Sequence, residues 1–219
     1  MDKQCLRFLA ATLLLSSSML QAGVILTVVP SSASFVEGSS GFIDVMISSN
    51  SSDALDGYLF DLNITGGSGA VFGVQSDAFL TNSNYVFFGR SANVANTLAA
   101  STISGGGSIA TLADNSWDFT SLPPGDPLPF TLSGSSRLLA RLEFNANGAG
   151  VFNVNIDSAT STFSDAAFST FAFTSTGGSF TITAVPEPSS MVLVGLIGFG
   201  GLMCRRKIGK RKIADTCIS

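Results

Sequence analysis

The chain has 219 residues, a formal net charge of −4, three cysteines and no histidine. The lack of histidine excludes Ser-His-Asp and Cys-His catalytic sites and every histidine-containing metal site. Between Cys5 and Cys204 there is no cysteine, so the central part of the chain has no disulfide and must be stabilised by packing.

The N-terminal segment is typical of a secretory signal peptide. Lys3 and Arg7 precede an apolar run over residues 8–15 and a small polar stretch over 16–18. We predict a signal peptide over residues 1–22, cleaved by signal peptidase after Ala22, although Leu20 fits that cleavage site poorly. The alternative is an N-terminal anchor that stays in place. Both alternatives export the residues that follow.

Residues 23–184 form the predicted exported domain, which is acidic. It contains three arginines (Arg90, Arg137 and Arg141) against twelve acidic residues, a net charge of −9. Nucleic acid and anionic membrane surfaces are therefore not expected partners of this domain.

The domain has the period-two hydrophobicity of β-strands. Apolar residues alternate with polar ones most regularly over residues 58–64, 137–144, 151–156 and 180–183. Shorter predicted strands cover residues 24–29, 42–47, 71–74, 85–88, 109–112 and 168–173, and only residues 77–80 suggest a helical turn. We predict an all-β fold, a single antiparallel β-sandwich or jelly roll of about nine or ten strands. Sixteen phenylalanines between Phe35 and Phe180 are its expected core.

Three groups of side chains offer oxygen ligands or hydrogen bonds. Asp53, Asp56 and Asp61 could bind Ca²⁺, but they could equally be solvent-exposed acidic residues in loops. Asn153, Asn155 and Asp157 share one strand face and form a polar ladder. A third group resembles the start of a calcium loop but lacks its glycine and glutamate: Asp114, Ser116 and Asp118.

Neither catalysis nor sugar stacking has a clear signature. No pair of carboxylates stands out as a glycosidase pair, so we predict no catalytic residue and no cofactor. The aromatic residues of the domain suited to sugar stacking are Trp117, Tyr58 and Tyr85. Tyr58 falls on the inward face of its strand, and Trp117 lies in a predicted packed loop.

The C-terminal region contains a proline-framed motif, an apolar run and a basic cluster. Val185, Pro186, Glu187 and Pro188 form the motif, which the prolines keep extended. The apolar run of thirteen residues would span about 20 Å as a helix, short against a hydrocarbon core of roughly 30 Å. The predicted membrane helix consists of Met191, Val192, Leu193, Val194, Gly195, Leu196, Ile197, Gly198, Phe199, Gly200, Gly201, Leu202 and Met203, and the cytoplasmic basic stop of Arg205, Arg206 and Lys207.

Residues 185–207 resemble the PEP-CTERM sorting signal of exported bacterial proteins. The resemblance implies recognition by a membrane-embedded exosortase, processing near Pro186, Glu187 and Pro188, and transfer of the mature protein to the cell surface. It also links the chain to exopolysaccharide and biofilm. The chain departs from the family pattern in its last twelve residues, a basic cytoplasmic tail over 208–219.

The central domain resembles cohesin-type or carbohydrate-binding-module jelly rolls. The resemblance lies in Pro30, the S-F-V-E-G run at 34–38, the strand at 42–47, L-D-G-Y-L-F-D-L at 55–62 and L-A-R-L-E-F at 139–144. It implies a nine-stranded sandwich that binds protein or sugar and does not imply catalysis.

These features together predict a non-enzymatic protein of the cell surface or extracellular matrix. It would insert, at least transiently, in the inner membrane through its C-terminal helix. Two alternatives stay open. One is a secreted carbohydrate-binding module or carbohydrate-active enzyme. The other is an envelope protein that stays permanently anchored in the membrane.

Overall fold

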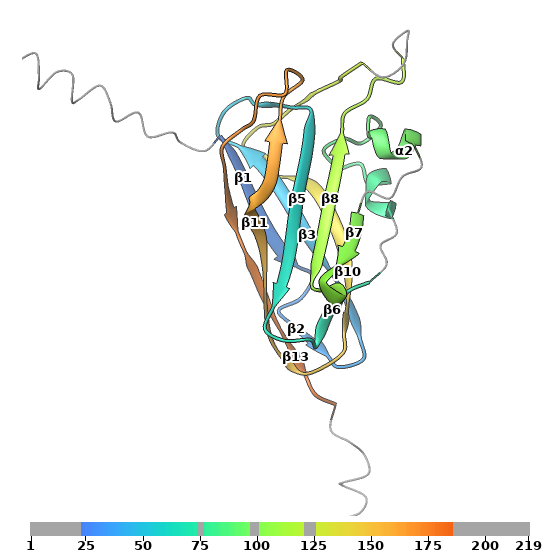
Figure 1. Cartoon of the computed structure of the whole chain (residues 1–219), viewed down its shortest axis with the longest axis vertical. Coiled ribbons are helices and arrows are strands. Elements are labelled where there is room, and N and C mark those ends of the chain that lie inside the picture. Colours follow the sequence, from blue (N-terminus) through green and yellow to red (C-terminus); the bar gives the residue numbers. More distant parts are fainter. Residues whose placement is uncertain (1–22, 74–76, 97–100, 121–125, 186–219) are drawn as a thin grey trace, which may run out of the picture. The chain divides into compact units, whose positions relative to one another are not determined.

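The computed structural model describes residues 23–73, 77–96, 101–120 and 126–185. The predicted signal peptide, membrane helix, basic stop and C-terminal tail lie outside these residues and stay predictions. The described part is almost entirely β (Figure 1), which confirms the predicted fold class.

Two sheets make up the sandwich, and a two-stranded pair lies beside them. Sheet A has the order β12 (Phe173–Thr176), β1 (Val24–Pro30), β3 (Ser40–Ser49), β10 (Arg137–Ala146), β6 (Ala70–Phe72). Sheet B has the order β2 (Ser34–Val36), β13 (Gly178–Thr183), β11 (Gly150–Ser164), β5 (Gly57–Thr65), β8 (Ile109–Asn115), β7 (Ser101–Ser104). The small pair is β4 (Ala54–Leu55) with β9 (Phe130–Thr131).

The pairing is antiparallel inside both sheets and parallel at two edges. β12 runs parallel to β1, and β2 runs parallel to β13. The chain therefore enters sheet A at Val24 beside Phe173 and leaves sheet B at Thr183 beside Val36.

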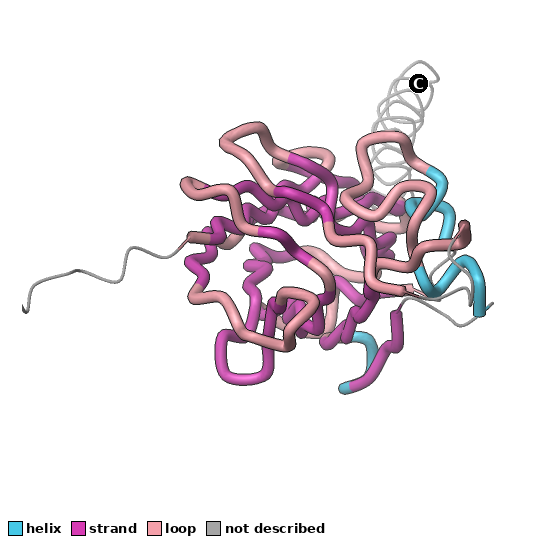
Figure 2. The backbone as a smooth tube through the Cα atoms, turned by 90° about the horizontal axis from the view of Figure 1, so that it is seen from above, coloured by secondary structure: helices cyan, strands magenta, loops and turns pink. Residues whose placement is uncertain are grey.

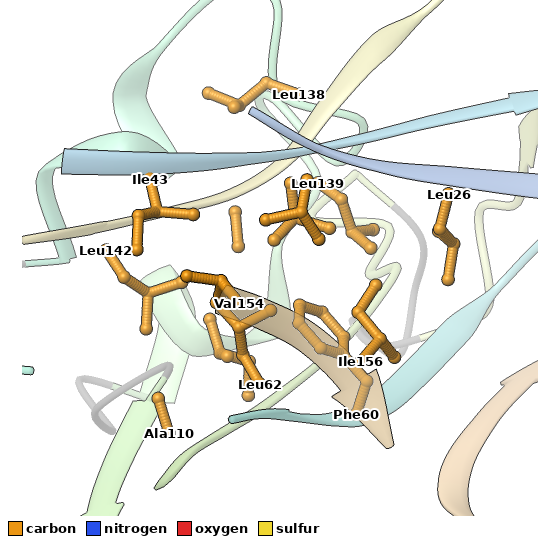
Figure 3. Packing of buried hydrophobic residues seen from close by; sticks show 14 of the residues in the cluster. Leu26, Ile43, Phe60, Leu62, Ala110, Leu138, Leu139, Leu142, Val154 and Ile156 are labelled. Carbon is orange, nitrogen blue, oxygen red and sulfur yellow. The ribbon is translucent and has the colours of Figure 1, made fainter. Parts of the chain in front are cut away.

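Alternation of side chains decides which face of each strand is buried. In β5, Phe60, Leu62 and Ile64 point inward while Leu59, Asp61 and Asn63 point outward. Figure 3 shows how the inward side chains of the two sheets, such as Leu26 and Ile43 from sheet A and Phe60 and Val154 from sheet B, share one core. Burial of this apolar surface is the main stabilising term.

Fifteen of the sixteen phenylalanines fall into three groups. The other, Phe42, is partly exposed, and the Arg141 guanidinium lies 4.1 Å from its ring centroid. Eight are fully buried: Phe60, Phe72, Phe79, Phe87, Phe144, Phe152, Phe163 and Phe180. Four more pack partly buried against the core: Phe35, Phe130, Phe171 and Phe173. Phe88, Phe119 and Phe168 are exposed. The prediction that all sixteen form the core is thus wrong for these three and for Phe42, which lies outside the core cluster.

An aromatic cluster joins the sheets at one end of the sandwich. The Phe144 ring, from sheet A, lies 4.9 Å from Phe35 and 4.6 Å from Phe180, centroid to centroid. Phe152 stacks on Phe180 at 5.6 Å. Gly41 allows this packing, because a Cβ there would overlap the rings of Phe35 and Phe144.

Two predicted strands are wrong. Residues 85–88 form turns, since the N–H of Tyr85 bonds to Asn82 and that of Phe88 to Tyr85, although Tyr85, Val86 and Phe87 are buried. Residues 168–172 form a loop, and the strand begins only at Phe173. The first error arose from a run of apolar residues that are buried without alternating. The second arose because Phe168, Phe171 and Phe173 are spaced along a segment that is mostly exposed.

The helical content is small and lies at the flank of the strands, as Figure 2 shows. It comprises the 3-10 helices η1 (Asp77–Thr81) and η2 (Gly105–Gly107) and the short helix α2 (Ala92–Asn96). The helical turn predicted at residues 77–80 is confirmed by η1. The helix α2 (A-N-V-A-N) and the strand β7 (S-T-I-S) were not predicted, because each is short and has a single large apolar residue.

Candidate functional site

The sorting motif is described only at its first residue. Val185 is half exposed, and Pro186, Glu187 and Pro188 lie outside the described residues. Across the described ranges, no helix has the length and apolar character needed to span a bilayer. The predicted membrane helix begins at Met191, beyond those ranges.

The outer face of sheet B carries a group of polar side chains, here called the polar face. It consists of Asp61, Asn63, Thr111, Asn153, Asn155 and Asp157, from β5, β8 and β11. The strand register places Asn155 opposite Asn63, and Asp157 opposite Asp61. The predicted ladder of Asn153, Asn155 and Asp157 is therefore confirmed as one side of a broader surface.

Two hydrogen-bonding groups of the polar face, on Asp61 and on Asn63, differ in their surroundings. The Thr111 hydroxyl donates to Asp61 Oδ1 at 2.5 Å. Asn63 Oδ1 is buried and has no hydrogen-bond partner among the described residues. A buried acceptor without a partner costs about 1–3 kcal/mol.

A depression of about 340 Å³ opens on the same outer surface, at the end where β5 begins. Leu59 from β5, Asn115 from β8 and Thr162 and Ser164 from β11 contribute to its lining, together with Asn93 of α2. It is open and has both polar and apolar walls, so it suits part of an extended ligand better than an enclosed small molecule.

One aromatic residue in the loop after β11 has a strained backbone conformation. Phe168, four residues after Ser164, has φ 62° and is 85% exposed. The Asp165 carboxylate holds its loop by accepting from the N–H groups of Ala167 and Ser169 at 2.9 and 2.8 Å. A left-handed conformation costs roughly 1–2 kcal/mol for a residue with a side chain. Phe168 gains no burial in return, which makes it a candidate contact residue.

Beneath the depression lies a buried polar network that the sequence did not reveal. The Tyr85 hydroxyl donates to Asp114 Oδ2 at 2.6 Å, and the Ser91 hydroxyl lies 2.5 Å from the same oxygen. The N–H of Asn115 donates to Oδ1 at 2.8 Å. The Tyr58 and Tyr85 hydroxyls are 2.9 Å apart. The alternation of β8 predicts only that Asp114 points inward, and its partners come from distant turns.

Burial controls the acidity of this network. Loss of solvation raises the pKa of Asp114 above its usual value, although hydrogen bonds from Ser91, Tyr85 and the main chain oppose the rise. Burial, followed by the charges of Tyr58 and Asp114, raises the pKa of Tyr85 well above 10.0. Asp114 therefore stabilises the fold more in its protonated form than as a carboxylate.

The Asp114→Asn variant tests this conclusion. Because the folded pKa is raised, the Asp114 contribution is fully present below the unfolded pKa of about 3.8 and declines as the pH rises through the folded pKa. The unfolding free energy of wild type minus that of Asp114→Asn should fall as the pH rises from the unfolded pKa toward the raised folded pKa. Urea unfolding at several pH values measures this difference. A constant or rising difference contradicts the assignment.

The proposed calcium ligands do not form one site. Asp53 contacts the Ser49 and Ser51 hydroxyls, Asp56 accepts from Ser116, and Asp61 accepts from Thr111. No group of three or more acidic or cysteine side chains within the described ranges could hold a metal ion. The calcium hypothesis for Asp53, Asp56 and Asp61 is therefore wrong, because each carboxylate has a different partner.

The other candidates also have structural partners. Asp114 and Ser116 point inward to different groups, and Asp118 caps the Thr120 turn. Tyr58 and Tyr85 are buried, as predicted for Tyr58. Trp117 is partly buried in the segment after β8. None of these three aromatic residues therefore offers a fully exposed stacking face.

Comparison with known proteins identifies the C-terminal motif and the fold. A family model described as the PEP-CTERM protein-sorting motif matches residues 184–207. The match confirms the resemblance seen in the sequence and implies an exported protein that an exosortase sorts to the cell surface. Comparison with curated proteins finds no match.

Solved structures of cohesins resemble the sandwich. A third ScaB cohesin of R. flavefaciens has 14% identity and a TM-score of 0.47, covering 77% of this chain and 99% of its own. A non-cellulosomal cohesin of Archaeoglobus fulgidus has 11% identity and a TM-score of 0.45, covering 78% and 96%. A type I cohesin of Clostridium thermocellum has 12% identity and a TM-score of 0.46, covering 75% and 97%. The cohesin-type resemblance predicted from the sequence concerns the fold alone.

Proposed function

We propose that this chain is a non-enzymatic protein of the cell surface or extracellular matrix, where its sandwich binds a matrix component. The sorting motif at residues 184–207 is the observation that carries the proposal. In this view the C-terminal helix holds the precursor in the inner membrane until exosortase cleaves it. Signal peptidase removes the N-terminal segment.

The surface chemistry of the domain supports a binding role. The polar face presents amides, hydroxyls and carboxylates on a rigid sheet. Rigid elements hold such groups in place at low entropic cost. Phe168, four residues after Ser164 of the depression, adds an exposed aromatic side chain.

The partner we favour is exopolysaccharide bound through hydrogen bonds. Hydroxyl-rich chains complement amide and carboxylate groups, and a net charge of −9 on residues 23–184 disfavours anionic partners. A neutral exopolysaccharide therefore fits this domain better than an acidic one. The alternative class is a carbohydrate-active enzyme, which would require two carboxylates facing each other across a cleft.

Binding to cells that make or lack exopolysaccharide tests the proposal. The double variant Asn153→Ala/Asn155→Ala should greatly reduce co-sedimentation of the purified protein with producing cells, because it removes two amides from the polar face. The matched control is Asn145→Ala/Asn147→Ala, which removes two exposed amides near the end of β10. This control should bind as wild type does.

The outcomes separate the candidate functions. Binding that requires the polysaccharide supports the proposal, and equal binding to cells lacking it indicates a protein ligand instead. Release of reducing ends from the polysaccharide would favour the enzyme. If wild type binds neither cell type, the binding role is contradicted.

A further inference from the structure

A carboxylate lies against the main chain where the sandwich begins. Gly23 directly precedes β1, and its carbonyl accepts from the Ser49 hydroxyl at 2.7 Å and from the N–H of Asn50 at 3.0 Å. A Cβ on Gly23 would lie 2.5 Å from Asp53 Oδ2 and 2.9 Å from Ser51 Oγ. A side chain at this position would therefore collide with the Asp53 carboxylate.

The same geometry places Asp53 close to the nitrogen of Gly23. In standard geometry, a residue's nitrogen lies about 2.5 Å from its Cβ. Because the Cβ position of Gly23 is 2.5 Å from Asp53 Oδ2, its nitrogen lies within about 5 Å of that oxygen. At this separation a positive charge on the nitrogen would attract the carboxylate appreciably.

Asp53 has hydroxyl partners but no cation within the described ranges. The Ser51 hydroxyl donates to Oδ2 at 2.6 Å, and the Ser49 hydroxyl lies 2.5 Å from it. The arginines of the domain are engaged elsewhere: Arg141 with Asp44, Arg90 with the carbonyls of Leu128 and Pro129, and Arg137 with Asn84. A positive group beside Asp53 would complete this arrangement.

We propose that Gly23 is the mature N-terminus and that its α-ammonium group pairs with Asp53. Hydrolysis of the Ala22–Gly23 peptide bond adds water, leaving a carboxylate on Ala22 and an amine on Gly23 that is protonated at neutral pH. The new charge fixes the start of β1 against the segment that follows β3. Removal of the signal peptide thereby stabilises the folded domain. This inference rests on export through an N-terminal signal, which is part of the proposed function.

The absence of lysine from residues 23–184 allows a direct test. In a mature protein that begins at Gly23 and lacks the basic stop and the C-terminal tail, the α-amine is the only amine that an acetylating reagent can modify. Peptide mapping of the exported protein should give Gly23 as the first residue. The Asp53→Asn variant should be acetylated about threefold to tenfold faster, because the ion pair keeps the amine protonated.

The matched control is Asp157→Asn, which removes one negative charge from the polar face of sheet B. It should be acetylated at the wild-type rate. A different first residue, or equal rates for wild type and Asp53→Asn, overturns the proposal. If Asp53→Asn does not fold, wild-type protein serves instead: acetylation should raise its unfolding constant about threefold to tenfold. An unchanged constant overturns the ion pair.

The acetylation sites at the two ends of the chain test two different processing events. Retention of the basic stop and the C-terminal tail would add Lys207, Lys210 and Lys212 as acetylation sites. Such labels would argue against exosortase processing without affecting the result at Gly23.

Discussion

Replacing Pro186, Glu187 and Pro188 together with alanine is expected to abolish the surface form and to leave full-length precursor in the inner membrane. Proline fixes its own backbone torsion and restrains the residue before it, so we expect the motif to be extended and accessible to a processing enzyme. Alanines would allow the membrane helix to extend upstream through the cleavage region. Cell fractionation and immunoblotting of the precursor and surface forms measure the effect.

The matched control is Ser189→Ala/Ser190→Ala. It changes the two residues between the motif and the apolar run and leaves both prolines and Glu187 in place. This variant should mature as wild type does. Equal surface display of the triple alanine variant and wild type would show that the motif is only a linker to a permanent anchor.

Phe144→Ala should destabilise the domain by about 3–5 kcal/mol. The Phe144 side chain is fully buried and contacts Phe35 and Phe180, which belong to the opposite sheet. Truncation would leave a cavity where the two sheets meet, and Gly41 beside it has no side chain to fill the space. Urea unfolding followed by fluorescence or circular dichroism measures the loss.

Phe168→Ala provides the control for the same chemical change. Phe168 is 85% exposed, so its truncation should change the unfolding free energy by about 0.5 kcal/mol or less. It should weaken binding instead if Phe168 contacts a partner. A small effect for Phe144→Ala, or a large one for Phe168→Ala, would contradict the division of the phenylalanines between core and surface.

The sequence predicted strands well where alternation was regular. The runs at 58–64 and 137–144 became β5 and β10, because a period of two places every second side chain in the core. It failed at residues 85–88, where Tyr85, Val86 and Phe87 are all buried in consecutive turns. It also missed β2 and β12, short edge strands whose parallel pairing depends on contacts distant in sequence.

The candidate site could be predicted only in part. Alternation along β11 identified Asn153, Asn155 and Asp157 as one face, but Asp61, Asn63 and Thr111 join them through strand register, which a single sequence does not specify. Asp114 looked like part of a calcium loop because acidic spacing alone does not show where side chains point. Its partners Tyr85 and Ser91 come from turns that only the fold brings close.

The mass of the surface-exposed protein tests the central claim most directly. Intact-mass spectrometry of protein released from the cell surface should give a chain that ends near Pro186, Glu187 or Pro188, with the apolar run and basic residues removed. A surface form that still contains the fifteen residues after Cys204, through Ser219, would contradict sorting by exosortase.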